Sequence, residues 1–233
     1  DQGLYQKMAD QLLFEGKAYY CFLTPEDIQS EKESAKKAGI PYIHSRKSSD
    51  MTDDEIKAHL AAGKPHAVRF KMTEDRVMTF KDMVRNDIDF DCSLISDFVI
   101  MKSDGTPSYN FAVVVDDSAM KISHVVRGED HISNMPRQLA LYEALGLTSP
   151  EFAHLPMILG PDKSKLSKRH GATAVTEYRD RGFLPEAFLN YLALLGWSPK
   201  GEKELLRLDE IVTDFDVDRI HKSNAVFDVQ KLT

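Results

Sequence analysis

Residues 122–131 read ISHVVRGEDH, a short apolar run that passes directly into charged side chains. The β-branched residues Ile122, Val125 and Val126 predict a strand over residues 122–126. We expect a helix from about Ser133 to Leu145 with Gly146 as its stop, and another strand-like run from Phe152 to Leu159. This strand–helix–strand order predicts half of a doubly wound α/β nucleotide-binding fold, in which ligands bind at the carboxyl ends of the strands.

A basic loop follows the second predicted strand. Residues 163–169, KSKLSKR, carry four positive charges and no negative one, directly after a Gly160-Pro161-Asp162 turn. The ammonium groups of Lys165 and Lys168 and the guanidinium of Arg169 suit the oxygens of a triphosphate. Such groups stabilise the charge that develops on phosphorus and on a leaving pyrophosphate. The alternative is a solvated basic turn of no special function.

The charged residues after Val126 offer a second candidate site. Arg127 lies at the carboxyl end of a predicted strand, where it could bind a substrate carboxylate through two parallel hydrogen bonds. The alternative is an ordinary surface pair with a neighbouring Glu or Asp. For His131 an ordinary half-buried histidine is favoured over a ligand or a catalytic base.

The run YNFAVVVDD, residues 109–117, fits a strand or a buried helix equally well. Its paired acids suit either a helix end next to the core or a metal site, and the pattern favours the first. The sequence contains neither a nucleophilic triad nor the phosphate-binding motif Gly-x-x-x-x-Gly-Lys.

The rest of the chain has regular helix and strand signals. We expect a helix over residues 4–13 that Gly16 ends, and helices that begin at the caps Thr24 and Thr52. Strands are expected at residues 18–23, 66–72, 76–80 and 98–101, and later helices at residues 173–181, 185–195 and 208–215. Residues 20–103 therefore read as an α+β module.

Composition excludes several classes of protein. The 233 residues include 30 Lys plus Arg against 37 Asp plus Glu, a net charge of −7, and 42% are hydrophobic, which is typical of a globular chain. No apolar run approaches the roughly 18 residues of a membrane span. The acidic balance argues against a general nucleic-acid coat. The distant Cys21 and Cys92 give no disulfide framework, so we expect a reducing compartment.

These motifs, in this order, resemble bacterial-type glutamyl-tRNA synthetases of class I. The resemblance covers the whole chain and is tightest from Asp104 to Trp197. It rests on PSYNFA (107–112), VDD (115–117), HVVRGEDH (124–131), KLSKRHG (165–171), GFLPEA (182–187), NYL (190–192) and LGW (195–197).

The resemblance implies an α/β fold: the second half of a Rossmann-type catalytic domain with an inserted connective domain. It implies a catalytic-domain helix at residues 1–19, the α+β insertion that grips the tRNA acceptor end at 20–103, and the second catalytic half at 104–164. Residues 165–233 resemble the signature loop and the start of a helical stem-contact domain.

The resemblance also implies roles for single residues. The catalytic set is Lys165, Lys168 and Arg169, with Lys168 as the main contact to the ATP phosphates. Arg127 matches the position that holds the side-chain carboxylate of glutamate, and Tyr109 and Val113 match other parts of that pocket. The implied ATP site consists of Asp130, Ile158, Lys165, Leu166, Ser167, Lys168 and Arg169.

Two departures from the family pattern matter. Some relatives bind zinc through Cys-x-Cys in the inserted domain, but here the pattern reads Cys21-Phe22-Leu23, so no zinc and no other metal site is predicted. The first class I signature, of the type His-x-Gly-His, does not occur in this sequence.

Both ends read as cut, and we expect the chain by itself to be an inactive fragment. A non-catalytic acceptor-binding or partner-binding module is the rival hypothesis.

The function that the resemblance implies is glutamate–tRNA ligation in protein biosynthesis. The expected substrates and partners are L-glutamate, ATP with Mg²⁺ and the acceptor end of tRNA(Glu), without a membrane. The cytoplasm is the expected location, with an organelle as the alternative. A glutaminyl-specific synthetase and a glutamyl transferase that modifies queuosine in tRNA are rival enzymes. The intact KLSKR and the long helical continuation favour the synthetase.

Overall fold

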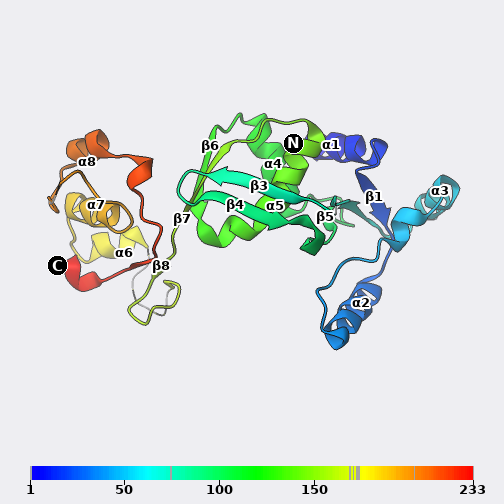
Figure 1. Cartoon of the computed structure of the whole chain (residues 1–233), viewed down its shortest axis with the longest axis horizontal. Coiled ribbons are helices and arrows are strands. Elements are labelled where there is room, and N and C mark those ends of the chain that lie inside the picture. Colours follow the sequence, from blue (N-terminus) through cyan, green and yellow to red (C-terminus); the bar gives the residue numbers. More distant parts are fainter. Residues whose placement is uncertain are drawn as a thin grey trace. The chain divides into compact units, whose positions relative to one another are not determined.

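The computed structural model describes residues 2–73, 75–167, 169, 171, 174–201 and 203–232. The chain forms two compact units, coloured along the sequence in Figure 1. The first comprises residues 1–80, 89–123 and 133–150, and the second comprises residues 81–88, 124–132 and 151–233. Neither unit is a continuous stretch of sequence, because the chain passes between them several times.

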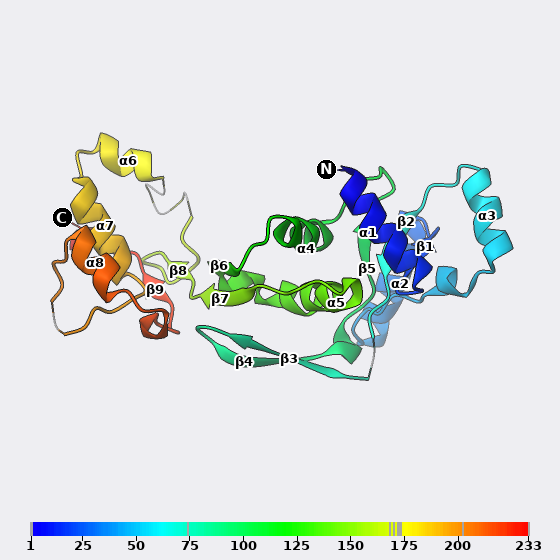
Figure 2. The same ribbon diagram turned by 90° about the horizontal axis from the view of Figure 1, so that it is seen from above.

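The first unit is built around a small antiparallel sheet of order β1-β2-β5. Helix α1 lies beside β1 (Figure 2), and the fully buried side chains include Leu12, Ile100 and Phe111. The predicted strands at 18–23 and 66–72 are confirmed with shorter bounds, and the strand at 98–101 is confirmed with the predicted bounds. The elements are α1 (Gln2–Phe14), β1 (Ala18–Cys21), α2 (Pro25–Ala38), α3 (Asp53–Ala61), β2 (Ala67–Phe70), β5 (Phe98–Met101), α4 (Tyr109–Ala119) and α5 (Met135–Leu145).

The predicted caps of α2 and α3 are both present. The Thr24 hydroxyl accepts from the Asp27 backbone N–H, and the Asp27 carboxylate accepts from the Thr24 N–H at 2.9 Å. Thr52 and Glu55 form the same reciprocal pair at the start of α3. Each box satisfies backbone donors that the first turn of a helix leaves unpaired.

The ambiguous run from residue 109 is a helix, α4. Its apolar face buries Phe111, Val114 and Val115, and α4 packs against α1 and α5. The Tyr5 hydroxyl of α1 donates to Asp116 Oδ1 at 2.7 Å. Tertiary packing therefore decides between the two conformations that the apolar pattern left open.

Strands β3 (Val77–Asp82) and β4 (Asn86–Asp91) are neighbours in a second sheet. The sheet also contains β6 (His124–Gly128) and β7 (Glu151–Leu155), and its order is β4-β3-β7-β6. Strand β4 was not predicted, because its sequence NDIDFD is rich in Asn and Asp, which are depleted in strands. Phe90 of β4 stacks on Phe80 of β3, with 5.9 Å between the ring centroids. This cross-strand pair compensates for the poor intrinsic preference.

The second unit contains the parallel pair β6 (His124–Gly128) and β7 (Glu151–Leu155), with Arg127 opposite His154. The end of β3 joins β7 in parallel, with Asp82 opposite Phe152. Helix α5 connects β6 to β7 along the chain, which confirms the predicted strand–helix–strand order. The first strand lies two residues later than predicted.

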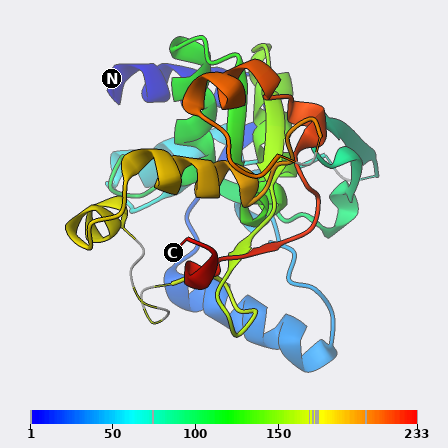
Figure 3. The ribbon, with the colours of Figure 1, turned by 90° about the vertical axis from the view of Figure 1, so that its left-hand side faces the viewer.

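The expected strand over residues 152–159 is two strands, β7 and β8 (Ile158–Leu159), and Pro156 lies in the break between them. Proline has no N–H to donate to a sheet. Strand β8 instead pairs in parallel with β9 (Ala225–Val226), so the C-terminal segment, red in Figure 3, runs beside it.

The helices of the second unit are α6 (Val175–Asp180), α7 (Pro185–Leu194) and α8 (Leu208–Asp214). They agree with the predicted helices within a few residues, and Thr173, the predicted start of α6, lies outside the described residues. Tyr178 and Phe227 form a buried cluster against which Leu166, Phe188 and Tyr191 pack. None of the helices in the described ranges is both long and apolar enough to span a membrane.

Candidate functional site

The parallel pairing of β6 and β7 brings charged residues to one sheet edge. Gly128 and Leu155 are opposite each other at the carboxyl ends of the two strands. The charged residues Glu129 and Asp130 follow β6, and the Met157 N–H after β7 donates to Glu129 Oε1 at 3.2 Å. This is the edge at which open α/β sheets bind ligands.

Asp130 and Lys165 form an ion pair at this edge, with 2.6 Å between Asp130 Oδ2 and Lys165 Nζ. The hydrogen bond from Lys165 holds the pKa of Asp130 below its ordinary value. Both side chains are well exposed, so the pair contributes little to stability and can open. A Cβ on Gly128 would lie 2.6 Å from Asp130 Oδ1, so residue 128 must lack a side chain for Asp130 to keep this position.

Strand β8 and a tight turn hold Lys165 in place. The Gly160 N–H donates to the Ser164 carbonyl at 2.8 Å, and Asp162 Oδ1 accepts from the Ser164 N–H at 2.9 Å. The Leu166 N–H donates to the Ile158 carbonyl at 2.9 Å. The predicted ATP residues Ile158, Lys165 and Leu166 are therefore neighbours, and the Leu166 side chain packs into the Tyr178–Phe227 cluster.

The rest of the basic loop is exposed where the structure describes it. The Arg169 guanidinium donates to Asp162 Oδ2 at 3.3 Å and to the Ser164 hydroxyl, and Ser167 is exposed. Lys168, the predicted main phosphate contact, lies outside the described residues.

Arg127 lies on β6 beside a buried histidine. Its Nε donates to His154 Nε2 at 3.1 Å, and its guanidinium carbon lies 5.5 Å from the centroid of the Phe152 ring. His154 Nδ1 in turn lies 2.6 Å from Asp82 Oδ2 at the end of β3. The side chains of His154 and Asp82 are both completely buried.

The protonation states of this buried pair follow from its surroundings. Burial lowers the pKa of His154 below its ordinary value, and nearby Arg127 and His131 lower it further against the opposing effect of Asp82. Burial raises the pKa of Asp82, but hydrogen bonds from the His154 ring and from backbone N–H groups outweigh it, so the net shift is downward. The pair is therefore a neutral histidine beside an ionised aspartate.

Asp82 and His154 were not among the site residues predicted from the sequence. The available signal was a histidine inside an otherwise apolar predicted strand, FAHL, because a buried polar side chain requires a partner. The partner itself lies 72 residues away, so no local pattern could identify it.

The other two residues of the predicted amino-acid pocket belong to the first unit. Tyr109 and Val113 lie four residues apart on α4 and so share one face of that helix. Tyr109 is 53% exposed and Val113 is half-buried. Arg127, the third predicted member, belongs to the second unit.

No group of three or more His, Cys, Asp or Glu side chains suited to a metal ion occurs among the described residues. Asp116, one of the paired acids after residue 115, accepts the Tyr5 hydrogen bond. In the inserted segment, Cys21 Sγ lies 3.6 Å from His44 Nε2, and Leu23 occupies the second position of the Cys-x-Cys pattern. The absence of zinc remains a prediction from the sequence.

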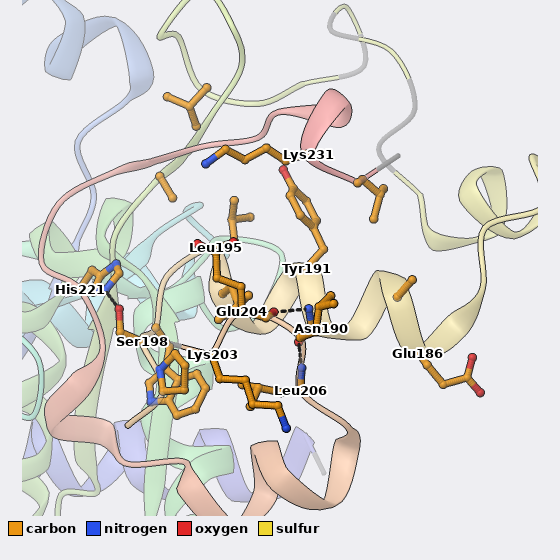
Figure 4. A pocket seen from close by; sticks show the side chains of 18 of the residues that line it. Glu186, Asn190, Tyr191, Leu195, Ser198, Lys203, Glu204, Leu206, His221 and Lys231 are labelled. Atoms are coloured by element: carbon orange, nitrogen blue, oxygen red, sulfur yellow. Dashed lines mark hydrogen bonds between the residues drawn. The ribbon is translucent and has the colours of Figure 1, made fainter. Parts of the chain in front are cut away.

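A cavity of about 1280 Å³ lies in the helical part of the second unit (Figure 4). Residues of α7 line it together with residues 195, 197–199, 201, 203–207, 221, 223–226, 231 and 232, and none of the predicted site residues lines it. In Figure 4 Asn190 donates to the Glu204 carbonyl at 2.8 Å, and Ser198 lies 2.6 Å from the His221 ring. Neither pair includes an arginine or a lysine such as the Arg127 and Lys165 of the sheet edge.

Comparison with known families agrees with this geometry. The family model of the class I tRNA synthetases (E and Q), catalytic domain, matches residues 2–233. The chain belongs to this family of class I synthetases. The α/β class predicted from the sequence is thereby confirmed.

Within this family, the similar proteins described next are all glutamate–tRNA ligases. The chain is 48% identical over 229 residues to glutamate–tRNA ligase 1 of Caldanaerobacter subterraneus subsp. tengcongensis, covering 98% of this chain and 48% of the relative. It is 50% identical over 230 residues to the glutamate–tRNA ligase of Aquifex aeolicus, with 98% and 49% covered. It also resembles the crystal structure of a glutamate tRNA ligase from Elizabethkingia meningosepticum in complex with its amino acid. The TM-score is 0.90 at 36% identity, covering 99% of this chain and 51% of that one.

The resemblance to glutamyl-tRNA synthetases that the motifs indicated is thus confirmed over the whole chain. The chain spans about half the length of the curated relatives that it matches.

Proposed function

We propose that this chain is part of an enzyme that activates L-glutamate with ATP and transfers it to the 3′ end of tRNA(Glu). The observation that carries the proposal is the sheet edge where Arg127 and the Asp130–Lys165 pair lie at the carboxyl ends of β6 and just beyond β8. A carboxylate-binding arginine and a phosphate-binding lysine are the two groups that an acid-activating ligase needs. Membership of the family supports the same conclusion.

In the first step an oxygen of the glutamate α-carboxylate attacks the α-phosphorus of ATP. The bond from phosphorus to the bridging oxygen breaks, so that glutamyl-adenylate forms and pyrophosphate leaves. The proposed role of Lys165, Lys168 and Arg169 is to stabilise the negative charge that gathers on the phosphate oxygens. Mg²⁺ enters with ATP as part of the substrate complex.

The exposed Asp130–Lys165 pair supports this role. Phosphate oxygens can replace Asp130 as the partner of Lys165 at little cost, because a surface ion pair is weak. Ile158, Leu166 and Ser167 are the proposed neighbours of the nucleotide, and Asp130 completes this set. Lys168 is included among the proposed nucleotide-binding residues only because the KLSKR motif resembles that of the family.

The proposed amino-acid pocket selects glutamate by its side-chain carboxylate. Arg127 supplies the charge, and Tyr109 and Val113 are proposed to line the remainder. The tie between Arg127 and a neutral histidine supports this role, because a neutral ring orients the guanidinium without cancelling its charge.

In the second step the 2′-hydroxyl of the terminal adenosine attacks the acyl carbon, and AMP leaves. Residues 20–103 are proposed to hold the acceptor end, residues 1–19 and 104–164 to belong to the catalytic domain, and residues 165–233 to begin the stem-contact domain. Both steps depend on positioning and on charge stabilisation by the protein. The proposed setting is the cytoplasm.

The test is glutamate-dependent ATP–pyrophosphate exchange and tRNA charging by the complete enzyme that contains this chain. Exchange with glutamate and charging of tRNA(Glu) are expected. Charging with glutamine, or transfer of glutamate to a queuosine-containing tRNA in place of the acceptor end, would contradict the proposal and identify the rival enzyme. Absence of both exchange and charging activity would support the rival hypothesis of a non-catalytic binding module.

A further inference from the structure

Three strands of the second unit contribute to one hydrogen-bonded chain of side chains. Asp82 is at the end of β3, His154 is on β7, and Arg127 is on β6. The distances are 2.6 Å from Asp82 Oδ2 to His154 Nδ1 and 3.1 Å from His154 Nε2 to Arg127 Nε. The proposed reactions have no step for Asp82 or His154, yet both side chains are completely buried.

Asp82 is held rigidly by backbone donors. Its Oδ1 accepts from the N–H groups of Val84 at 3.0 Å and Arg85 at 2.8 Å, and its Oδ2 accepts from the His154 N–H at 3.1 Å. A buried carboxylate with this many donors is ionised and immobile. It is therefore a fixed acceptor for the histidine ring.

The fixed acceptor determines the tautomer of His154. An ionised carboxylate can only accept, so Nδ1 must carry the ring proton. Nε2 then has a lone pair, and Arg127 Nε, which can only donate, points at it. The opposite tautomer, or a protonated ring, would set an N–H group against an N–H group.

We propose that Asp82 and His154 are positioning residues that fix the guanidinium plane of Arg127 for the side-chain carboxylate of the amino acid. This inference rests on the proposed function, in which Arg127 binds that carboxylate. A carboxylate in the place of His154 would also orient Arg127, but it would cancel the charge and compete with the substrate. A neutral imidazole orients the arginine and preserves the charge.

The face of Phe152 adds a second constraint on the same plane. Its ring centroid lies 5.5 Å from the Arg127 guanidinium carbon, and Phe152 also stacks on His154 with 6.2 Å between the ring centroids. Stacking on an aromatic face favours a parallel guanidinium. The arginine therefore contacts two residues of β7, His154 through its Nε and Phe152 through its guanidinium carbon.

The kinetic test uses Asp82→Asn and His154→Phe in the complete enzyme. The amide introduced by Asp82→Asn can donate to His154 Nδ1, which moves the ring proton to Nε2, and the phenyl ring introduced by His154→Phe has no acceptor at all. Each variant is expected to raise the KM for glutamate by about tenfold or more, the loss of one charged hydrogen bond, with the KM for ATP unchanged. Asp87→Asn, an exposed acid on β4, and His124→Gln on β6 are the matched controls and should match wild type.

Two readouts separate positioning from a merely structural role. His154→Gln supplies an amide oxygen near the position of Nε2, so its glutamate KM should lie between those of wild type and His154→Phe. In the ¹⁵N NMR spectrum of the wild-type histidines, His154 should be protonated at Nδ1 and unprotonated at Nε2. This spectrum is measured on the wild-type protein and does not depend on the variants being stable.

The outcomes distinguish the two proposals. An unchanged glutamate KM in His154→Phe, equal effects of the Gln and Phe variants, or a proton on Nε2 in the wild type each overturn the positioning inference while tRNA glutamylation stands. Absence of glutamate-dependent exchange in the wild type defeats the proposed function, whatever tautomer His154 adopts.

Discussion

Two cationic residues of the candidate site are held in opposite ways. Arg127 is tied to a neutral, buried histidine, whereas Lys165 is paired with an exposed, ionised aspartate. The first arrangement keeps the charge in a fixed orientation, and the second can exchange one anion for another. The fixed orientation of Arg127 suits recognition of the glutamate carboxylate, and the exchangeable partner of Lys165 suits binding of the ATP phosphates, as we propose.

Replacing Arg127 tests the selector. In Arg127→Gln the charge is lost while the length and the polarity of the side chain are roughly kept. The KM for glutamate should rise at least about 30-fold, because removing one partner of a desolvated charge pair costs about 2 kcal/mol or more. Pyrophosphate exchange at varied glutamate concentration measures it. Arg179→Gln, an exposed arginine on α6, serves as the control. Wild-type KM and kcat in Arg127→Gln would remove Arg127 from the pocket.

Replacing Lys168 tests the phosphate contact that the KLSKR motif implies. Lys168→Ala should lower the rate of pyrophosphate exchange about 100-fold, the usual cost of losing one group that stabilises transition-state charge. Lys200→Ala, an exposed lysine after Trp197, should leave the rate unchanged. An exchange rate in Lys168→Ala equal to that of wild type would exclude Lys168 from the transition state.

Candidate site residues could be proposed from the sequence where they are adjacent in it. Arg127 and Asp130 fall in one short motif after a strand signal, and Lys165 falls in another. Asp82 and His154 were missed because the histidine in FAHL indicates that a partner exists but not which residue it is, and Asp82 lies 72 residues away. Only the parallel register of β6 and β7 sets His154 opposite Arg127.

At the scale of the element, the carboxyl end of β6 depends on a residue without a side chain. Gly128 has ordinary backbone angles, so its role is space and not conformational freedom. The position of the Asp130 carboxylate requires that space, and Lys165 is paired with the same carboxylate. The end of β6 is therefore linked to Lys165, a residue of the proposed nucleotide site.

Gly128→Ala tests this link. The new Cβ displaces the Asp130 carboxylate, because the two atoms would otherwise be 2.6 Å apart. The flexible carboxylate end can move, so we expect a folded protein with an altered KM for ATP. Circular dichroism and exchange kinetics at varied ATP concentration measure the two quantities. Gly196→Ala has no atom within 4 Å of its new Cβ and is the matched control. Equal ATP KM values in the two variants would refute the link.

The fold elements were largely predictable, and the errors have physical causes. Capping boxes at Thr24 and Thr52 are local and were read correctly. The split of residues 152–159 into β7 and β8 follows from Pro156 and from the pairing of β8 with β9, a partner far along the chain. Strand β4 was missed because its pairing with β3 overrides its composition.

At the scale of the whole molecule, the Asp82–His154 pair makes stability depend on pH. Both groups have pKa values below their ordinary ones. When the pH falls below 6.5, the ordinary pKa of histidine, His154 becomes protonated in the unfolded chain but stays neutral in the folded protein. The contribution of His154 to stability is thus fully present above about pH 6.5 and declines as the pH falls. Asp82 adds a second loss at lower pH, as it becomes protonated.

The free energy of unfolding, measured with urea from pH 8 to pH 5, should therefore decrease below about pH 6.5. Each proton taken up on unfolding contributes a slope of at most about 1.4 kcal/mol per pH unit. His154→Gln removes this titration, so its slope should be shallower than that of wild type. His124→Gln, at an exposed position, should keep the wild-type slope. Parallel curves for wild type and His154→Gln would show that His154 is not held neutral in the fold.

The sequence by itself determined the family, the α/β class, most helices and strands, and the residues of the candidate site that lie within short motifs. The class, the helices and the strands follow from local signals: apolar periodicity, capping residues and charge patterns within a few positions. The family and the candidate site residues follow from the resemblance of whole motifs. The tertiary structure alone decided that residues 109–119 are a helix and that β4 and β9 exist. It also decided that Asp82, His154 and Arg127 form a hydrogen-bonded chain. The reason is that each of these depends on a partner distant in sequence, and the contact exists only once the chain has folded.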